Sequence, residues 1–381
     1  MVAVGTDNGV YISEIENPRG WSKAINTSRV TQIAVLEDFS LMLLIADKTL
    51  IAYHLDNVCP AGGGPPNNES ARRAPQKLSG SRDVGFFATG KMKDRTLVFY
   101  KKKDGINSTF KVLEPVLHKA SEKRSRFGLS SLATSSSSSV RVGGGRTEFF
   151  REYDEFYIPT ECLGINLFHS SLAVASAKGF EVLTLDKKLP VTIPDTRVEG
   201  VQRIAGRLQG LAPLGMFRLP SGDAGTGTGD DKGRRVSAIG AVAASGSGSG
   251  AAAEEFLLCY EGCAVYVNKH GDISRSVIME FVGKATAVAI HGPYVLLFDK
   301  DFVEVRNAMN GRLRQVISGR DVRCLDDGVG GSAAQSTVGA GSGGVAGKGV
   351  KKRTVKVGMQ HPENEKCQVV VELIINEGLK E

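Results

Sequence analysis

The chain has 381 residues, of which 41% are apolar, and a formal net charge of +7 from 48 basic and 41 acidic residues. The apolar content is sufficient for a packed core and excludes wholesale disorder. The near balance of charge disfavours a dedicated nucleic-acid binder, which would carry one strongly basic face with interleaved aromatic residues. A chain of this length exceeds what one simple core usually supports unless the architecture repeats.

Cysteine usage and hydropathy indicate the cellular compartment in which the protein is expected. Six cysteines are spread along the chain without a CxxC motif, and several lie in apolar, strand-like runs where free cysteine acts as a small core residue. This usage indicates a reducing compartment. No N-terminal signal pattern is present, and the longest unbroken apolar run is Leu41–Ala46, whereas a membrane span needs roughly 20 residues. We therefore expect a soluble, cytoplasmic protein.

In chain order, short apolar and β-branched runs flank tight turns, which is the local pattern of a β-hairpin. The clearest example is Leu172–Leu185, where two such runs flank Lys178-Gly179. No segment between the hairpins has the pattern of a long amphipathic helix. The unit occurs seven times: Val2–Ser13, Leu41–Leu55, Val84–Lys101, Leu172–Leu185, Phe256–Val267, Tyr294–Val305 and Val355–Ile375.

Four segments of low complexity interrupt this repeat. They are rich in Gly, Ser, Ala and Pro and lack periodicity, so we expect loop or disordered inserts. Their approximate bounds are 59–76, 119–146, 220–253 and 326–351. One of them contains Arg234-Arg235-Val236-Ser237, which fits a basophilic kinase consensus of the kind that matches often by chance.

The repeat count predicts the fold. Without the inserts about 275 residues remain, or roughly 39 for each hairpin, against about 40–45 for a four-stranded propeller blade. Each hairpin would supply the two middle strands of a blade, and runs such as Val30–Leu36 and Arg312–Ile317 would supply inner and outer strands. We predict an all-β, seven-bladed β-propeller with low-complexity loop insertions, in which residues 1–381 form a single domain. Radial closure would leave no exposed sheet edge.

A search for catalytic and cofactor motifs finds none, so neither a cofactor nor a metal is predicted. Ser342–Gly349 departs from a phosphate-binding loop at both ends, since Ser342 stands where the first Gly belongs and Gly349 where Ser or Thr must reach magnesium. The six histidines never occur at HxH or HxxxH spacing, which would indicate a metal site. Asp154, Glu155 and Glu161 are interpreted as surface acids rather than as catalytic carboxylates.

Aromatic and basic clusters also have structural interpretations. The densest aromatic stretch contains Phe149, Phe150, Phe156 and Tyr157, which we interpret as blade core rather than as a ligand site. Most basic runs are interpreted as solvated loops. The residues proposed for partner binding are charges beside the hairpins that would meet an acidic surface: Lys101, Lys102, Lys103 and Arg151.

An ordered set of stretches is informative when taken together: Val30–Asp38, Leu44–Leu50, Arg95–Lys103, Ser108–Pro115, Glu155–Cys162, Ala177–Val182 and Asp301–Asn307. This set resembles the citron homology (CNH) domain found at the C-terminal end of fungal Rho-type guanine-nucleotide exchange factors. The similarity covers nearly the whole chain outside the inserts. One further strand is expected before Val2 in that family, so the chain is expected to be a fragment.

The resemblance implies a non-catalytic regulatory or docking module in Rho and cell-wall-integrity signalling. Its partners would be a Rho-family small GTPase or another signalling protein, and the exchange domain of the parent protein. The exchange-catalysing helices themselves are expected outside these residues. The resemblance also implies recruitment to the inner face of the plasma membrane.

Two alternatives stay open at this stage. Propellers can host hydrolases, which would require histidines and carboxylates gathered at one mouth of the central channel. A peripheral membrane or tethering scaffold with weak anionic-membrane contact is suggested by Lys348–Lys356, which has five basic residues and no acidic one.

Overall fold

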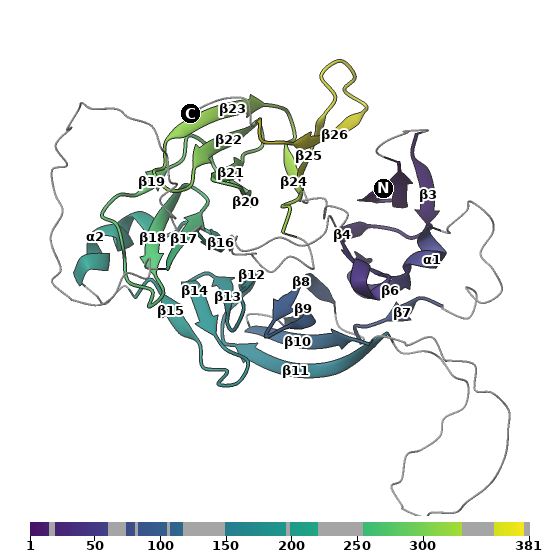
Figure 1. Cartoon of the computed structure of the whole chain (residues 1–381), viewed down its shortest axis with the longest axis horizontal. Coiled ribbons are helices and arrows are strands. Elements are labelled where there is room, and N and C mark those ends of the chain that lie inside the picture. The colour runs from purple at the N-terminus through teal and green to yellow at the C-terminus, as the bar shows by residue number, and fades with distance from the viewer. Residues whose placement is uncertain are drawn as a thin grey trace, which may run out of the picture. The chain divides into compact units, whose positions relative to one another are not determined.

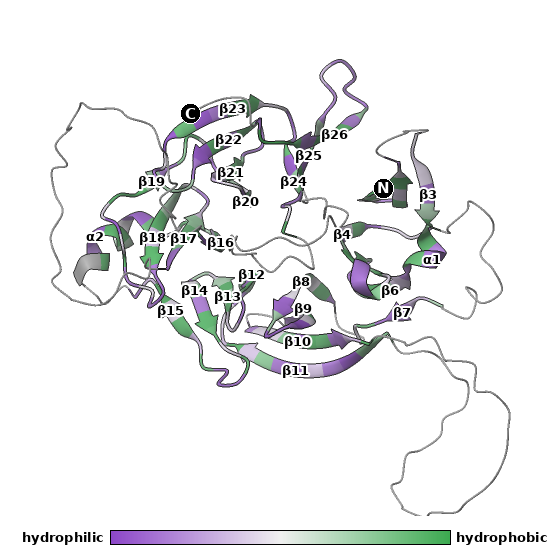
Figure 2. Ribbon diagram, in the orientation of Figure 1, coloured by the Kyte–Doolittle hydropathy of each residue, from purple (hydrophilic) through white to green (hydrophobic). Residues whose placement is uncertain are grey.

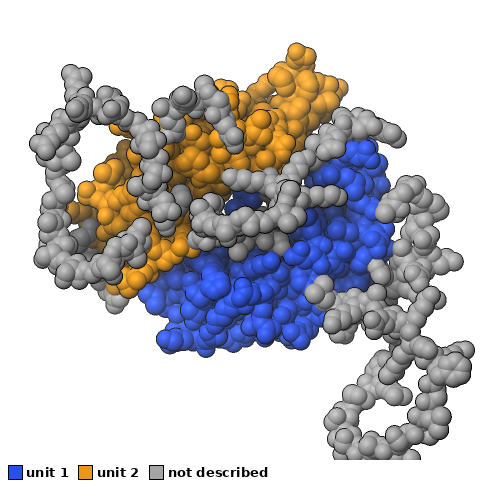
Figure 3. All heavy atoms as spheres, viewed as in Figure 1, with its two compact units in different colours: residues 1–191, 326–353 blue, residues 192–325, 354–381 orange. Residues whose placement is uncertain are grey.

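The computed structural model describes residues 1–14, 20–59, 74–80, 83–104, 107–116, 149–195, 199–219, 254–329 and 354–376. The predicted inserts 119–146 and 220–253 lie outside the described residues. Only the ends of the inserts 59–76 and 326–351 are described, and there Gln76 and Asp326 belong to strands. Within the described residues the chain forms two compact units, Met1–Val191 with Asp326–Arg353 and Thr192–Leu325 with Thr354–Glu381 (Figure 3).

Unit 1 contains four sheets whose strands follow one another along the chain (Figure 1). Blade 1 comprises β1 (Val2–Thr6), β2 (Gly9–Ser13) and β3 (Ser22–Ile25). Blade 2 comprises β4 (Val30–Leu36), β5 (Leu41–Ala46), β6 (Thr49–His54) and β7 (Gln76–Lys77). Blade 3 comprises β8 (Val84–Met92), β9 (Arg95–Asp104), β10 (Asn107–Pro115) and β11 (Phe150–Ile158). Blade 4 comprises β12 (Cys162–Leu167), β13 (Leu172–Ser176), β14 (Gly179–Leu183) and β15 (Val191–Ile193), which reaches the boundary of the unit.

Unit 2 contains three sheets with the same sequential strand order. Blade 5 comprises β16 (Pro213–Arg218), β17 (Glu255–Tyr260), β18 (Cys263–Asn268) and β19 (Met279–Glu280). Blade 6 comprises β20 (Ala287–His291), β21 (Tyr294–Phe298), β22 (Phe302–Asn307) and β23 (Leu313–Ser318). Blade 7 comprises β24 (Arg323–Asp326), β25 (Val355–Gln360) and β26 (Gln368–Leu373). The helices of the described residues are short: the 3₁₀ turn η1 (Glu37–Phe39), α1 (Leu55–Val58) and α2 (Glu199–Leu208).

All seven predicted hairpins form, one in each sheet, and the fold is an all-β, seven-bladed β-propeller, as predicted. Each hairpin was expected to supply the two middle strands of a four-stranded blade, and three hairpins depart from this expectation. Among the described residues blades 1 and 7 have three strands each, so one strand of the hairpin lies at the edge of the sheet. In blade 3, β8 and β9 are the first two of the four strands, and β10 and β11 follow outside them. The single-domain organisation of residues 1–381 stays a prediction.

Helix α2 was not anticipated from the sequence, although its ten residues do not contradict the expectation that no long amphipathic helix lies between the hairpins. Val201 and Ile204 are buried on it, whereas Arg203 and Arg207 are exposed. This is a helical period of three to four residues, which makes α2 a short amphipathic helix. Arg207 also forms an ion pair with Glu280 of β19.

Local turn chemistry fixes the registers of the hairpins. Asp47 and Lys48 between β5 and β6, and Lys93 and Asp94 between β8 and β9, all have positive φ angles between 46° and 64°. Two such residues in succession give the type I′ geometry that matches the right-handed twist of paired strands. At Gly9, with a φ of 136°, a Cβ atom would lie only 2.3 Å from the Ile25 carbonyl oxygen, so glycine is required there.

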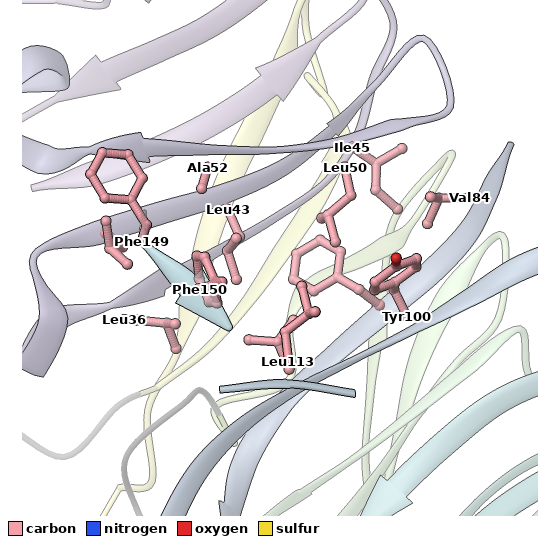
Figure 4. Packing of buried hydrophobic residues seen from close by; sticks show 13 residues of the cluster. Leu36, Leu43, Ile45, Leu50, Ala52, Val84, Tyr100, Leu113, Phe149 and Phe150 are labelled. Atoms are coloured by element: carbon pink, nitrogen blue, oxygen red, sulfur yellow. The ribbon is translucent and has the colours of Figure 1, made fainter. Parts of the chain in front are cut away.

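Cores lie between neighbouring blades of each unit. In unit 1 apolar residues of blades 2 and 3 form one cluster, in which Leu43, Leu50 and Val98 are fully buried (Figure 4). A second cluster joins blades 3 and 4 around Phe110 and Phe156, whose rings stack with their centroids 4.9 Å apart. In unit 2 equivalent clusters join blade 5 to blade 6 and blade 6 to blade 7. Within each unit, neighbouring sheets therefore bury their apolar side chains against one another, which stabilises the blades.

Candidate protein interface

The three consecutive lysines proposed for partner binding lie on β9 of blade 3, and they do not act together. Successive side chains of a strand point to opposite faces, so Lys102 faces away from Lys101 and Lys103. Lys101 is buried, Lys102 is half-buried and Lys103 is exposed. The predicted patch is therefore divided between two faces of the sheet.

Lys101 is the clearest correction to the predicted site. Its ammonium group donates a hydrogen bond of 2.7 Å to the Cys162 carbonyl oxygen, at the start of blade 4. The Cys162 N–H group donates to the Ser108 hydroxyl at 2.9 Å. Burial raises the pKa of the Cys162 thiol, against the opposing effects of the Ser108 hydrogen bond and the Lys101 charge. Lys101 thus holds the connection between blades 3 and 4, and it is not accessible to a partner.

Arg151 is exposed, and it is one of two arginines that share a single carboxylate. Glu114 of β10 accepts hydrogen bonds from Arg95, at 3.0 Å, and from Arg151. The Arg95 guanidinium lies 5.8 Å from the centre of the Tyr153 ring, within range of a cation–π interaction. We call Arg95, Glu114, Arg151 and Tyr153 the Glu114 cluster. Two guanidinium groups share one carboxylate, so the cluster keeps an excess positive charge.

The other charges of β11 are engaged within blade 3 or by the loop after β14. Lys111 forms ion pairs with Glu155 at 2.9 Å and with Glu152 at 3.6 Å, and the hydrogen bond to Glu155 is the main cause that raises its pKa. Lys188 contacts Asp154 and donates 3.1 Å to the Glu155 carbonyl oxygen. These contacts fit the interpretation of Asp154 and Glu155 as surface acids. Hydrophilic residues recur along β11 (Figure 2).

The aromatic stretch of β11 divides into core and surface. Phe149, Phe150 and Phe156 are buried, as the blade-core interpretation expected. Tyr157 was assigned to the same core, but 51% of it is exposed, and Tyr153 is 42% exposed. The bulge opposite Val112 and Leu113 displaces this strand by one residue, which the sequence pattern did not indicate. Exposed tyrosine beside arginine is the composition typical of interface hot spots.

Other predicted features fall outside this surface. Ser237 and Ser342–Gly349 lie outside the described residues, and so does most of Lys348–Lys356. Among the described residues, no group of three or more His, Cys, Asp and Glu side chains is arranged to hold a metal ion. None of the described helices has the length and apolar character required to cross a bilayer.

Seven blades of sequential strands place the chain in the class of β-propellers. Comparison with known proteins then gives the family. A family model described as the CNH domain matches residues 1–328, and the chain belongs to this family. The resemblance predicted from the sequence is thereby confirmed.

Curated relatives are fungal exchange factors. Rho1 guanine nucleotide exchange factor 1 of Schizosaccharomyces pombe is 29% identical over 334 residues, covering 86% of this chain and 21% of that protein. Rho1 guanine nucleotide exchange factor 3 of the same organism is 26% identical over 333 residues, covering 84% of this chain and 22% of that protein. RHO1 GDP-GTP exchange protein 2 of Saccharomyces cerevisiae is 22% identical over 340 residues, covering 84% and 21%. The chain spans about a fifth of the length of these relatives.

Solved structures support the fold. The AfRom2 CNH domain matches with a TM-score of 0.67 at 23% identity, covering 98% of this chain and 91% of that chain. A chain from the crystal structure of BBS1N in complex with ARL6DN matches with a TM-score of 0.50 at 8% identity, covering 98% of this chain and 87% of that chain.

Proposed function

We propose that this chain is the non-catalytic regulatory and protein-interaction module of a Rho guanine-nucleotide exchange factor. The observation that carries the proposal is the match to the CNH family together with relatives that are Rho1 exchange factors. A β-propeller supplies a rigid scaffold with exposed edges and loops, which suits protein contact. The module acts by docking, and exchange is catalysed by another part of the parent protein.

The proposed partner is a Rho-family small GTPase or the exchange domain of the parent protein, in Rho and cell-wall-integrity signalling. We place the contact on the Glu114 cluster. Tyr153 offers a large, rigid and exposed side chain, and its neighbouring guanidinium groups are already positioned by Glu114. Ordering such side chains before association lowers the entropy cost of binding. The excess positive charge favours an acidic surface on the partner.

Binding of the purified chain to two candidates tests this proposal by isothermal titration calorimetry. The candidates are a Rho GTPase, loaded with GDP or with a non-hydrolysable GTP analogue, and the exchange domain supplied as a separate protein. We expect a complex with one of them with a Kd on the order of 10–50 µM. Absence of binding to both candidates at these concentrations would contradict the docking function.

Two variants test the assigned surface. Arg151→Ala and Tyr153→Ala should each weaken the complex by about tenfold, because truncating an anchor of this type costs more than about 1 kcal/mol. Arg29→Ala is the matched control, since Arg29 is also an exposed arginine of unit 1 in an ion pair, with Asp47. Unchanged affinity in both cluster variants would remove the Glu114 cluster from the interface and leave the docking function standing.

We further propose that the module works in the cytoplasm and is brought to the inner face of the plasma membrane with its exchange factor. The support is again the kinship with Rho1 exchange factors. Imaging a fluorescent fusion of the parent protein with and without this chain tests the proposal. Identical distribution of the two fusions would show that the chain takes no part in recruitment.

A further inference from the structure

The outer edge of blade 6 differs from an ordinary solvated edge. Its last strand, β23, pairs with β22 on one side, and no strand of the described residues pairs with its other side. Five of its six residues are exposed, including Leu313 and Val316, each 46% exposed. The strand contains neither proline nor lysine, two residues that commonly protect an edge from strand addition.

The connection that leads into β23 is firmly held. The Tyr266 hydroxyl donates 2.9 Å to the Ala308 carbonyl oxygen, and the Arg275 guanidinium donates to the Met309 carbonyl oxygen. Arg306 donates 2.8 Å to the Gly311 carbonyl oxygen. A strand whose entry is fixed in this way is already ordered before a partner arrives, which lowers the cost of pairing with it.

The apolar side chains of β23 lie beside a buried ion pair. Val316 is opposite Glu304 and Leu313 is opposite Arg306 in the β22–β23 register. Glu304 is 1% exposed, is in contact with Arg306, and accepts a 2.9 Å hydrogen bond from the Val282 N–H group. Val282 itself is 68% exposed. We call Val282, Leu313 and Val316 the blade 6 strip. These are three exposed apolar residues next to the Glu304–Arg306 ion pair, in which the two charges neutralise each other.

The segment that contains β23 carries an excess of positive charge. Residues 307–320 contain three arginines, Arg312, Arg314 and Arg320, and no acidic residue. All three are exposed, and Arg320 is 3.7 Å from Glu365 in a loose pair. Arg314 occupies the bulge between Leu313 and Gln315, which displaces its side chain from the regular alternation. An edge strand with apolar and cationic side chains complements an extended segment with apolar and acidic ones.

We propose that β23 is a docking site for an extended peptide segment with alternating apolar and acidic residues, which adds to blade 6 as a further strand. Backbone hydrogen bonds to β23 supply the affinity, as in other cases of strand addition. The apolar residues of the segment cover the blade 6 strip, and its carboxylates meet Arg312 and Arg314. This site is separate from the Glu114 cluster and does not depend on the proposed function.

The probe is a fluorescein-labelled peptide of alternating valine and glutamate, about eight residues long, because strands of globular proteins usually have 3–10 residues. Fluorescence anisotropy with the full chain should show saturable binding that weakens as salt is raised. A peptide with lysine in place of glutamate should bind at least about tenfold more weakly. A peptide with proline at alternate positions keeps the glutamates but removes backbone N–H groups, and it should not bind. Equal binding of either control peptide would overturn the proposal.

Two variants locate the site. Arg312→Glu should weaken binding of the valine–glutamate peptide by about tenfold. Arg203→Glu is the matched control, because Arg203 is also an exposed arginine of unit 2, and it should leave the affinity unchanged. Hydrogen exchange provides a measurement that does not depend on a variant's folding: the amides of residues 313–318 should exchange more slowly when the peptide is bound. Protection elsewhere with none at β23, or equal loss in both variants, would overturn the assignment.

A second copy of the chain is the competing occupant. Analytical ultracentrifugation over a wide range of protein concentration separates the two possibilities. A chain that stays monomeric and binds the peptide supports the proposal. A dimer that protects residues 313–318 and is dissociated by the peptide would assign the edge to self-association and overturn the proposal.

Discussion

The outer edges of blade 3 and blade 6 are built in different ways. β11 is nine residues long and is covered by ion pairs, with Lys188 donating to the backbone of the strand itself. β23 is six residues long and exposes Leu313 and Val316 beside arginines. In the Glu114 cluster a largely buried carboxylate is paired with exposed guanidinium groups, whereas in the pair nearest β23 both Glu304 and Arg306 are largely buried.

This difference indicates two kinds of contact. A lysine bonded to an edge carbonyl, with several carboxylates along the strand, discourages another strand from pairing with β11. A partner can then reach blade 3 only through side chains such as Tyr153 and Arg151. At β23 no strand of the described residues pairs with the outer side, and the exposed side chains beside it are mainly apolar or cationic. The two contacts that we propose therefore differ in kind, with a side-chain interface in unit 1 and a strand-pairing interface in unit 2.

The largest expected effect comes from the buried pair beside β23. Arg306→Met leaves the Glu304 carboxylate buried without its guanidinium partner, which should lower the free energy of unfolding by about 3–5 kcal/mol. Urea unfolding at pH 7 measures this loss of unfolding free energy. The double variant Glu304→Gln/Arg306→Met should recover most of the loss, because no buried charge then remains. A single variant as stable as the unmodified chain would show that the pair is solvated.

Substitutions of the β9 lysines should differ in their effect on stability, according to how deeply each lysine is buried. Lys101→Met removes the donor to the Cys162 carbonyl oxygen and should cost about 1–3 kcal/mol, since a buried acceptor is left without its partner. Lys103→Met, at an exposed position of the same face, should change stability by less than about 0.5 kcal/mol. Thermal unfolding of both variants measures the difference. Equal effects would contradict the structural role assigned to Lys101.

Low pH should destabilise the connection between β22 and β23. Glu255 holds the Arg275 guanidinium, which donates to the Met309 carbonyl oxygen in that connection. Burial acts to raise the pKa of Glu255, but hydrogen bonds from Arg275 and Ser274 outweigh it, so the pKa lies below its ordinary value. Because the folded-state pKa is lowered, the stabilisation is present above the unfolded value of about 4.3 and is lost as pH falls through the folded value. Unfolding free energy should therefore fall more steeply between pH 5 and pH 3 (about the range set by these pKa values) for the unmodified chain than for Glu255→Gln. Parallel curves would contradict the assignment.

The smallest effect is expected in blade 3. Glu114→Gln releases Arg95 and Arg151 from their shared carboxylate, but both guanidinium groups are more than half exposed. Exposed pairs of this kind contribute about 0.2–1 kcal/mol, and the variant should lose no more than that. The comparison with Arg306→Met is the sharpest test of the contrast between the two edges. A loss of several kcal/mol at Glu114 would show that the cluster is structural and not available to a partner.

The hairpins were predictable because their information is local. Each has a tight turn between short apolar runs, as at Asp47-Lys48, and counting them was enough to predict the number of blades. The positions of β10 and β11 outside β9 were not predictable in the same way. Strand runs in blade 3 are long, and which two of its four strands occupy the middle depends on pairing between segments that are separated by an insert. Helix α2 was missed because Val201 and Ile204 form too short an apolar stripe between glycines.

The candidate site was predicted only in part. Arg151 is exposed and lies at the centre of a charged cluster, but Lys101 is buried and the three lysines divide between two faces. Runs of like charge in a strand carry no information about which neighbours cover each face. Tyr153 and Arg95 were not singled out, because they meet only when β9, β10 and β11 are side by side.

By itself the sequence determined the all-β class, the seven repeated units and the family, since each depends on local turns, on periodicity or on residues that can be compared in order. Tertiary structure decided which charged side chains are buried, which carboxylate gathers two arginines, and which sheet edge is left open. These outcomes depend on contacts between residues distant in sequence, such as Lys101 with Cys162 and Arg275 with Met309, and the energy of a charge depends on how far such contacts remove it from water.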